Sequence, residues 1–132
     1  MAIIEKAGGA NLDAVQHHVA VSTLKMEDAN RAGNSVYTRF DSAYDAIIRC
    51  ALAVLEISGM KVSTDFGHHR VMVDFLSENL GFEPQRVNAL RLITRDRNAN
   101  VYGGDRPTTE MEVREVIALA VKVRADTEVW LR

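Results

Sequence analysis

The spacing of glycine and proline is the feature that most constrains the fold of this chain. Eight glycines and two prolines occur in 132 residues. Most of them lie at the ends of long segments whose apolar residues recur at helical spacing, and this pattern predicts five helices. The predicted helices run from near Asn11 or Asp13 to about Gly33, from about Val36 to Gly59, through Val71 to Gly81, from Pro84 to Gly103-Gly104, and from the capping pair Thr109 and Glu112 to the C-terminus.

The same pattern predicts an all-α fold. No segment alternates with period two over a sustained stretch, so no strand is predicted. Hydrophobic residues make up 47% of the chain and charged residues 26%, an ordinary globular mixture. We expect residues 1–10 to form an N-terminal extension and residues 11–132 to form one antiparallel bundle of about five helices.

Cysteine usage and hydropathy favour a cytoplasmic protein. The chain has one cysteine, Cys50, which excludes a disulfide framework and suits a reducing compartment. We expect Cys50 to be a small packing residue of the core. No apolar run approaches the ~20 residues that a membrane span needs, so a membrane is not among the expected partners.

Positive charge is concentrated in one stretch of the chain. Residues 84–106 contain five arginines and two aspartates, whereas the whole chain has a net charge of −2. This is not the globally basic surface of a dedicated nucleic-acid-binding protein. It is compatible with a small arginine-lined site for an anion.

A helical wheel of the fourth predicted helix turns Arg97 and Asn98 toward the apolar face, with Arg95 and Tyr102 on its flank. Buried polar groups need partners, and three arrangements could supply them. Arg97 could pair with Asp41 or Asp45 of the second helix. Alternatively, the polar residues could line a cleft for an anion or a nucleic-acid phosphate, or they could fill a dimer interface.

Residues 95–102 of this helix read Arg-Asp-Arg-Asn-Ala-Asn-Val-Tyr. Together with residues 42–46 (Ser-Ala-Tyr-Asp-Ala) and 67–71 (Gly-His-His-Arg-Val), this string resembles the HEPN superfamily of small helical bundles. The likeness is to a bacterial branch that reads Arg-Asn-x-x-x-Tyr in place of the Arg and His of other members. It covers roughly residues 12–131, and it implies a HEPN-like bundle that commonly forms a homodimer.

The resemblance also implies which residues form the site. The family's Arg corresponds to Arg97 and its polar neighbour to Asn98, while Tyr102 takes the position of the His. A second register starts at Arg95 and places Asn100 at the His position. We prefer the first register because Arg97 faces inward on the wheel.

The absence of the family's histidine from this motif affects the activity that the resemblance implies. Active HEPN members resemble metal-independent ribonucleases in which Arg and His act on the scissile phosphate. Histidine transfers protons near neutral pH, whereas tyrosine is a poor base and asparagine does not titrate. His68 or His69 could enter the cleft of Arg97 and replace the missing group. The adjacent pairs His17-His18 and His68-His69 do not have metal-chelating spacing, so neither a metal nor another cofactor is predicted.

Three functions follow as hypotheses. The first is a non-catalytic HEPN-like protein that binds a protein partner, or an RNA or nucleotide phosphate, through Arg95, Arg97, Asn98 and Tyr102. The second is a metal-independent endoribonuclease of a toxin–antitoxin or defence system, with Arg97, Tyr102, His68 and His69 as candidate catalytic residues and an antitoxin as a partner. The third is a purely structural homodimer in which Arg97 anchors an internal ion pair.

Overall fold

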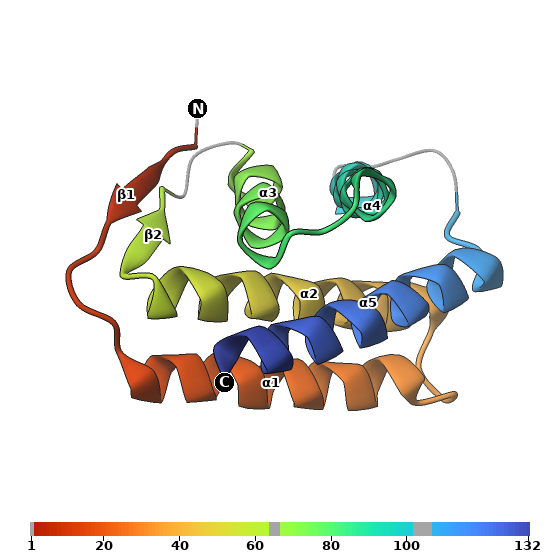
Figure 1. Cartoon of the computed structure of the whole chain (residues 1–132). Coiled ribbons are helices and arrows are strands. Elements are labelled where there is room, and N and C mark those ends of the chain that lie inside the picture. The colour runs from red at the N-terminus through yellow and green to blue at the C-terminus, as the bar shows by residue number, and fades with distance from the viewer. Residues whose placement is uncertain (1, 64–66, 102–106) are drawn as a thin grey trace.

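The computed structural model describes residues 2–63, 67–101 and 107–132, and of residues 100 and 101 it describes only the backbone. These residues form five helices and two short strands (Figure 1). In chain order they are β1 (Ile4–Lys6), α1 (Leu12–Asn30), α2 (Val36–Ile57), β2 (Met60–Val62), α3 (His68–Leu80), α4 (Pro84–Val101) and α5 (Glu110–Leu131).

The helix ends lie close to the predicted positions because the capping residues act locally. The side chains of Asn11 and Ser35 each accept a backbone N–H from the first turn of α1 and α2. Gly81 ends α3 in the left-handed region with φ of 69°. Thr109 and Glu112 form the predicted capping box at the start of α5. The prediction of five helices is confirmed, while the predicted stop at Gly103-Gly104 lies outside the described residues.

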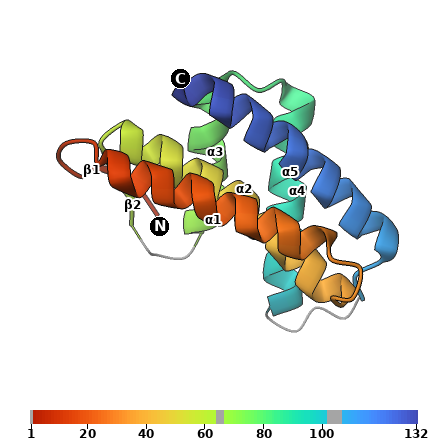
Figure 2. The same ribbon diagram turned by 90° about the horizontal axis from the view of Figure 1, so that it is seen from below.

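The central element is α2, which contacts all four other helices. Twelve of its 22 residues are buried, four of them alanines. α1 runs antiparallel to α2 on one side, and α5 lies obliquely against both (Figures 1 and 2). α2 is therefore covered on more than one side, which agrees with its many buried apolar residues.

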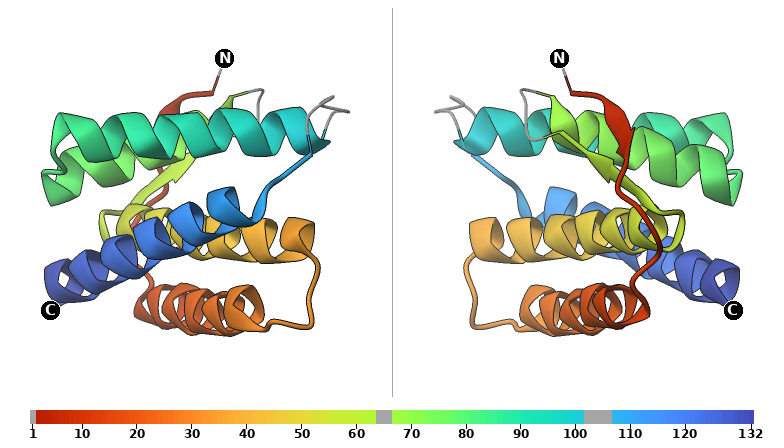
Figure 3. Two further views of the ribbon diagram at one scale, coloured as in Figure 1. Left: turned by 90° about the vertical axis from the view of Figure 1, so that its right-hand side faces the viewer. Right: turned by 90° about the vertical axis from the view of Figure 1, so that its left-hand side faces the viewer.

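The prediction of one antiparallel bundle is correct only within helix pairs. α3 and α4 form an antiparallel hairpin on the side of α2 away from α1 (Figure 3). This hairpin crosses α2, because Figure 1 shows α3 and α4 nearly end-on while α2 lies in the plane of the picture. An apolar stripe identifies the buried face of a helix but does not set its crossing angle, which depends on how the side chains of two helices interlock.

The prediction that the chain has no strands is wrong. β1 and β2 pair antiparallel, with Ile4 opposite Val62, so the first ten residues include a strand of this small sheet. Ala2, beside β1, is buried. Three-residue strands are too short to show period-two alternation, and their partners lie far apart in sequence. Gly59 precedes β2 with φ of +68°, and a Cβ there would lie 2.7 Å from the carbonyl oxygen of Gly8.

A buried polar network joins α1, α2 and α5. The Ser22 hydroxyl donates to the carbonyl oxygen of Ala46 at 2.9 Å and accepts from Arg124 Nε at 3.0 Å. Cys50 is buried beside Ser22, and burial raises the pKa of its thiol. The prediction that Cys50 is a core packing residue is thus confirmed. Among the described residues, no helix is long and apolar enough for a membrane span.

Candidate functional site

Arginines on α4 differ in whether they contact a carboxylate. Three of the four do, and the pairs are Arg86–Asp126, Arg91–Asp74 at 3.0 Å and Arg95–Asp96 at 3.4 Å. Arg97 has no ion pair within the described part of the chain. Of these four cations, Arg97 therefore offers the guanidinium that is free to meet an external anion.

The guanidinium of Arg97 lies over the ring of Tyr44. Its Cζ is 5.6 Å from the ring centroid, within cation–π distance. The Arg97 side chain is half-buried, and its Nε is buried without an acceptor among the described residues. The prediction that Arg97 faces the interior is confirmed.

The carboxylates predicted as partners of Arg97 do not form that ion pair in the described structure. Asp45 instead lies 3.7 Å from Lys25. Asp41 is close enough to sense Arg97 electrostatically: burial raises the pKa of Asp41, and the positive charge of Arg97 opposes this rise. The wheel identified the inward face of α4 correctly, but it could not show which residues of α2 lie opposite that face.

A chain of hydrogen bonds links α2, α3 and α4 beneath Arg97. Thr94 donates its hydroxyl to the carbonyl oxygen of Leu90 at 2.9 Å, and the buried Tyr44 hydroxyl donates to Thr94 Oγ1 at 3.3 Å. His69 Nδ1 lies 3.1 Å from the Tyr44 oxygen. Because the Tyr44 proton is directed to Thr94, His69 must donate its Nδ1–H, which leaves Nε2 as an acceptor.

The environment of this chain of hydrogen bonds shifts two pKa values. Burial raises the pKa of Tyr44 to about 12, against a smaller opposing effect of its hydrogen bond to Thr94. Burial also lowers the pKa of His69 to about 4, and the neighbouring His68 and Arg97 add to this shift. At neutral pH both Tyr44 and His69 are therefore uncharged.

The structure brings together some of the predicted site residues. Arg97 and His69 both contact the Tyr44 ring, and the His68 ring packs edge-on against His69 with centroids 4.4 Å apart. Asn98 is half-buried on α4. Arg95 is exposed and pairs with its neighbour Asp96, which disfavours the register that begins at Arg95. Tyr102 and the side chain of Asn100 lie outside the described residues.

A cleft of about 310 Å³ beside His69 was missed by the sequence analysis. It lies between α1, the second half of α2, β2 and the start of α3. Its lining residues are His18, Ile48, Leu52, Leu55, Glu56, Met60, Lys61, Val62, His68, His69 and Met72. Within the described ranges, no group of three or more His, Cys, Asp or Glu residues is arranged to hold a metal ion.

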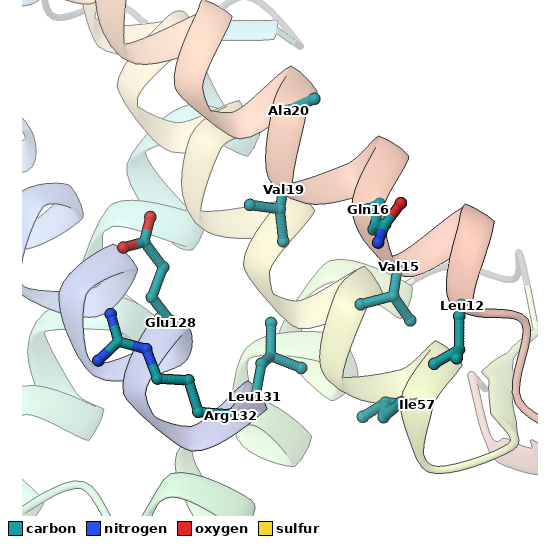
Figure 4. Close-up of a pocket in the computed structure, with 9 residues that line it drawn as sticks. All are labelled: Leu12, Val15, Gln16, Val19, Ala20, Ile57, Glu128, Leu131 and Arg132. Atoms are coloured by element: carbon teal, nitrogen blue, oxygen red, sulfur yellow. The ribbon is translucent and has the colours of Figure 1, made fainter.

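A second groove, of about 550 Å³, lies between α1, the end of α2 and the end of α5. Figure 4 shows Val15 and Val19 of α1 facing Leu131 and Ile57 across it, with Glu128 at its edge. The groove is on the α1 side of the molecule, whereas Arg97 lies on the α4 side of α2. It is therefore a separate surface feature.

Comparisons with family models, curated proteins and solved structures find no match to this chain.

Proposed function

We propose that this chain binds a phosphate group of RNA or of a nucleotide at Arg97 without cleaving it. The observation that carries this proposal is the free guanidinium. Arg97 lies against Tyr44 and is half-buried, yet among the described residues it lacks the carboxylate partner that each other arginine of α4 has. Arginine suits phosphate because its planar donors match two phosphate oxygens.

The energetics of Arg97 support an external ligand. Leaving a buried donor without an acceptor costs about 1–3 kcal/mol, and more for a charged group. Nε of Arg97 is buried and has no acceptor among the described residues. A bound phosphate would supply the missing acceptor, and neither Tyr44 nor His69 would repel it, since both are neutral at physiological pH. The same reasoning disfavours the purely structural function, which requires Arg97 to anchor an internal ion pair.

The lack of cleavage follows from the shifted pKa values. An efficient general acid or base has a pKa near the working pH. His69, with a pKa of about 4, is a weak base, and Tyr44, with a pKa of about 12, holds its proton too strongly. In the ligand-free protein neither group is suited to move protons at a scissile phosphate.

A metal-independent ribonuclease is the second candidate, and the position of His69 favours it. His69 is electrostatically coupled to Arg97 and contacts the same tyrosine. A bound phosphate would raise the pKa of His69, because a nearby negative charge stabilises the imidazolium. His69, with His68 beside it, would then serve as the acid or base that the Arg-Asn-x-x-x-Tyr pattern lacks.

We also propose that the chain is a HEPN-like cytoplasmic protein that forms a homodimer. In the ribonuclease alternative a protein partner such as an antitoxin would bind it. These proposals rest on the sequence resemblance around Arg97 and Asn98. Sedimentation of the purified chain tests the homodimer, and a monomer at micromolar concentration would contradict it.

Binding of a labelled single-stranded RNA, measured by fluorescence anisotropy over a range of salt concentrations with EDTA present, tests the phosphate site. Arg97→Gln should weaken binding at least tenfold and reduce the salt slope by about 0.7, the value for one phosphate contact on a single strand. Arg91→Gln is the matched control, since it removes one charge from an exposed, paired arginine of the same helix. Equal binding by the two variants would contradict the proposal. RNA fragments that disappear in His69→Gln would establish the ribonuclease instead.

A further inference from the structure

The cleft beside His69 adjoins the group formed by Arg97, Tyr44 and His69. His69 belongs to both, because its ring contacts Tyr44 and also lines the cleft. Along α2, the cleft residues Ile48 and Leu52 follow Tyr44 by four and eight residues. At about 1.5 Å per residue they lie roughly 6 and 12 Å along the helix from the tyrosine beneath Arg97. A molecule anchored at Arg97 can therefore extend into the cleft.

The walls of the cleft suit a planar ligand without net charge. Apolar side chains form most of its lining, namely Ile48, Leu52, Leu55, Met60, Val62 and Met72. Glu56 and Lys61 contribute one charge of each sign. A volume of about 310 Å³ matches a single small ligand. The cleft thus provides apolar contact area but no excess positive charge for a second phosphate.

The hydrogen bonds of two histidines determine what the cleft can recognise. His18 Nδ1 lies 3.1 Å from Arg49 Nη1, and since arginine can only donate, His18 must carry its proton on Nε2. His69 has the opposite tautomer, because its Nδ1–H donates to Tyr44. The other ring nitrogen, Nε2, is therefore a hydrogen-bond donor on His18 and an acceptor on His69.

We propose that this cleft binds the nucleobase of the RNA or nucleotide whose phosphate binds at Arg97. The inference rests on the phosphate site proposed above and adds the part of the ligand that provides selectivity. Every nucleobase combines apolar faces with an edge that carries both acceptors and donors. The His18 donor and the His69 acceptor complement such an edge, and the apolar lining packs against the base.

Calorimetric titration separates the two sites. The ligands are AMP, GMP, CMP, UMP and ribose 5-phosphate, which has the phosphate and sugar but no base. At least one nucleotide should bind tenfold or more tightly than ribose 5-phosphate. Equal binding of all five ligands would overturn the base cleft and leave the phosphate site intact. A nucleoside that binds while ribose 5-phosphate does not would show the reverse. A single-stranded RNA octamer, titrated in parallel, shows whether a strand or a free nucleotide is the better source of the base.

A substitution that fills the cleft with a larger side chain tests the same assignment. Leu52→Trp should abolish the advantage of nucleotides over ribose 5-phosphate and leave ribose 5-phosphate binding within twofold of wild type. Leu12→Trp is the control, since it makes the same change in the separate groove between α1 and α5. A nucleotide preference that survives Leu52→Trp but is lost in Leu12→Trp would overturn the assignment.

A measurement on the unmodified chain does not depend on whether the variants fold. Imidazole ¹⁵N spectra should show the Nε2–H tautomer for His18 and the Nδ1–H tautomer for His69. Saturation with the tightest nucleotide should shift both sets of signals, because both histidines line the cleft. Unshifted His18 and His69 signals at saturation would contradict the proposal.

Discussion

The buried hydroxyl of Tyr44 is the single group that connects three helices at the candidate site. It donates to Thr94 of α4 and accepts from His69 of α3. Tyr44→Phe removes both hydrogen bonds and keeps the ring beneath Arg97. The substitution therefore separates the stability of the hydrogen-bonded chain from the anion site that it supports.

The expected loss can be derived from what remains after the substitution. Thr94 still donates to Leu90, and His69 is half-buried, so water can replace part of what it loses. Removing one partner from buried hydrogen bonds costs about 1–3 kcal/mol, and these compensations favour the lower half of that range. For a domain of this size the melting temperature should fall by roughly 3–8 °C.

Thermal and urea unfolding followed by circular dichroism measure this loss. Tyr37→Phe is the control, because Tyr37 lies on the same helix but is 49% exposed, whereas Tyr44 is fully buried. It should change stability by less than about 0.5 kcal/mol. Affinity of Tyr44→Phe for ribose 5-phosphate should stay within twofold of wild type. Equal stability of the two variants would refute the described hydrogen bonding of Tyr44.

Three further predictions concern other parts of the structure. The free energy of unfolding should fall as pH decreases from 6.5 toward 4. The pKa of His69 is about 4 in the folded chain and 6.5 in the unfolded chain, so in this range the unfolded chain binds the extra proton. Urea titrations of His69→Gln should show a smaller decrease. Ser22→Ala should destabilise the chain by about 1–3 kcal/mol in urea unfolding, since Arg124 loses an acceptor, and an unchanged midpoint would contradict this. Gly59→Ala should lower the melting temperature, because the added Cβ would lie 2.7 Å from the carbonyl oxygen of Gly8. Gly33→Ala is the control and should lower it less, since nothing lies within 4 Å of a Cβ there. Equal effects would argue against the turn geometry at Gly59.

Local signals in the sequence were sufficient to predict the helices. Capping residues such as Thr109 and breakers such as Gly81 act within a few residues, so the helix ends could be predicted from the chain alone. The inward face of α4 was also predictable: Leu90 and Thr94, which lie on the same side of the helix as Arg97, are both buried. The spacing of apolar residues along a helix indicates which of its faces is buried.

Long-range partnerships could not be predicted in the same way. The sequence named Tyr44 only within residues 42–46 of the family resemblance and predicted no contact for it, since its hydroxyl partners lie on two other helices. The cleft is formed by residues of α1, α2, β2 and α3, which are far apart in the sequence. The small sheet joins residues about sixty positions apart, and three-residue strands carry no periodic signal.

The Nε–H signal of Arg97 in ¹H–¹⁵N spectra is the most direct test of the central claim that this guanidinium binds phosphate. In the ligand-free chain Nε lacks an acceptor among the described residues. Addition of ribose 5-phosphate should shift this signal strongly and protect the proton from exchange with water, while the Nε signal of Arg91, which already pairs with Asp74, should stay in place. An Arg97 signal that is unchanged when the protein is saturated with RNA would contradict the account.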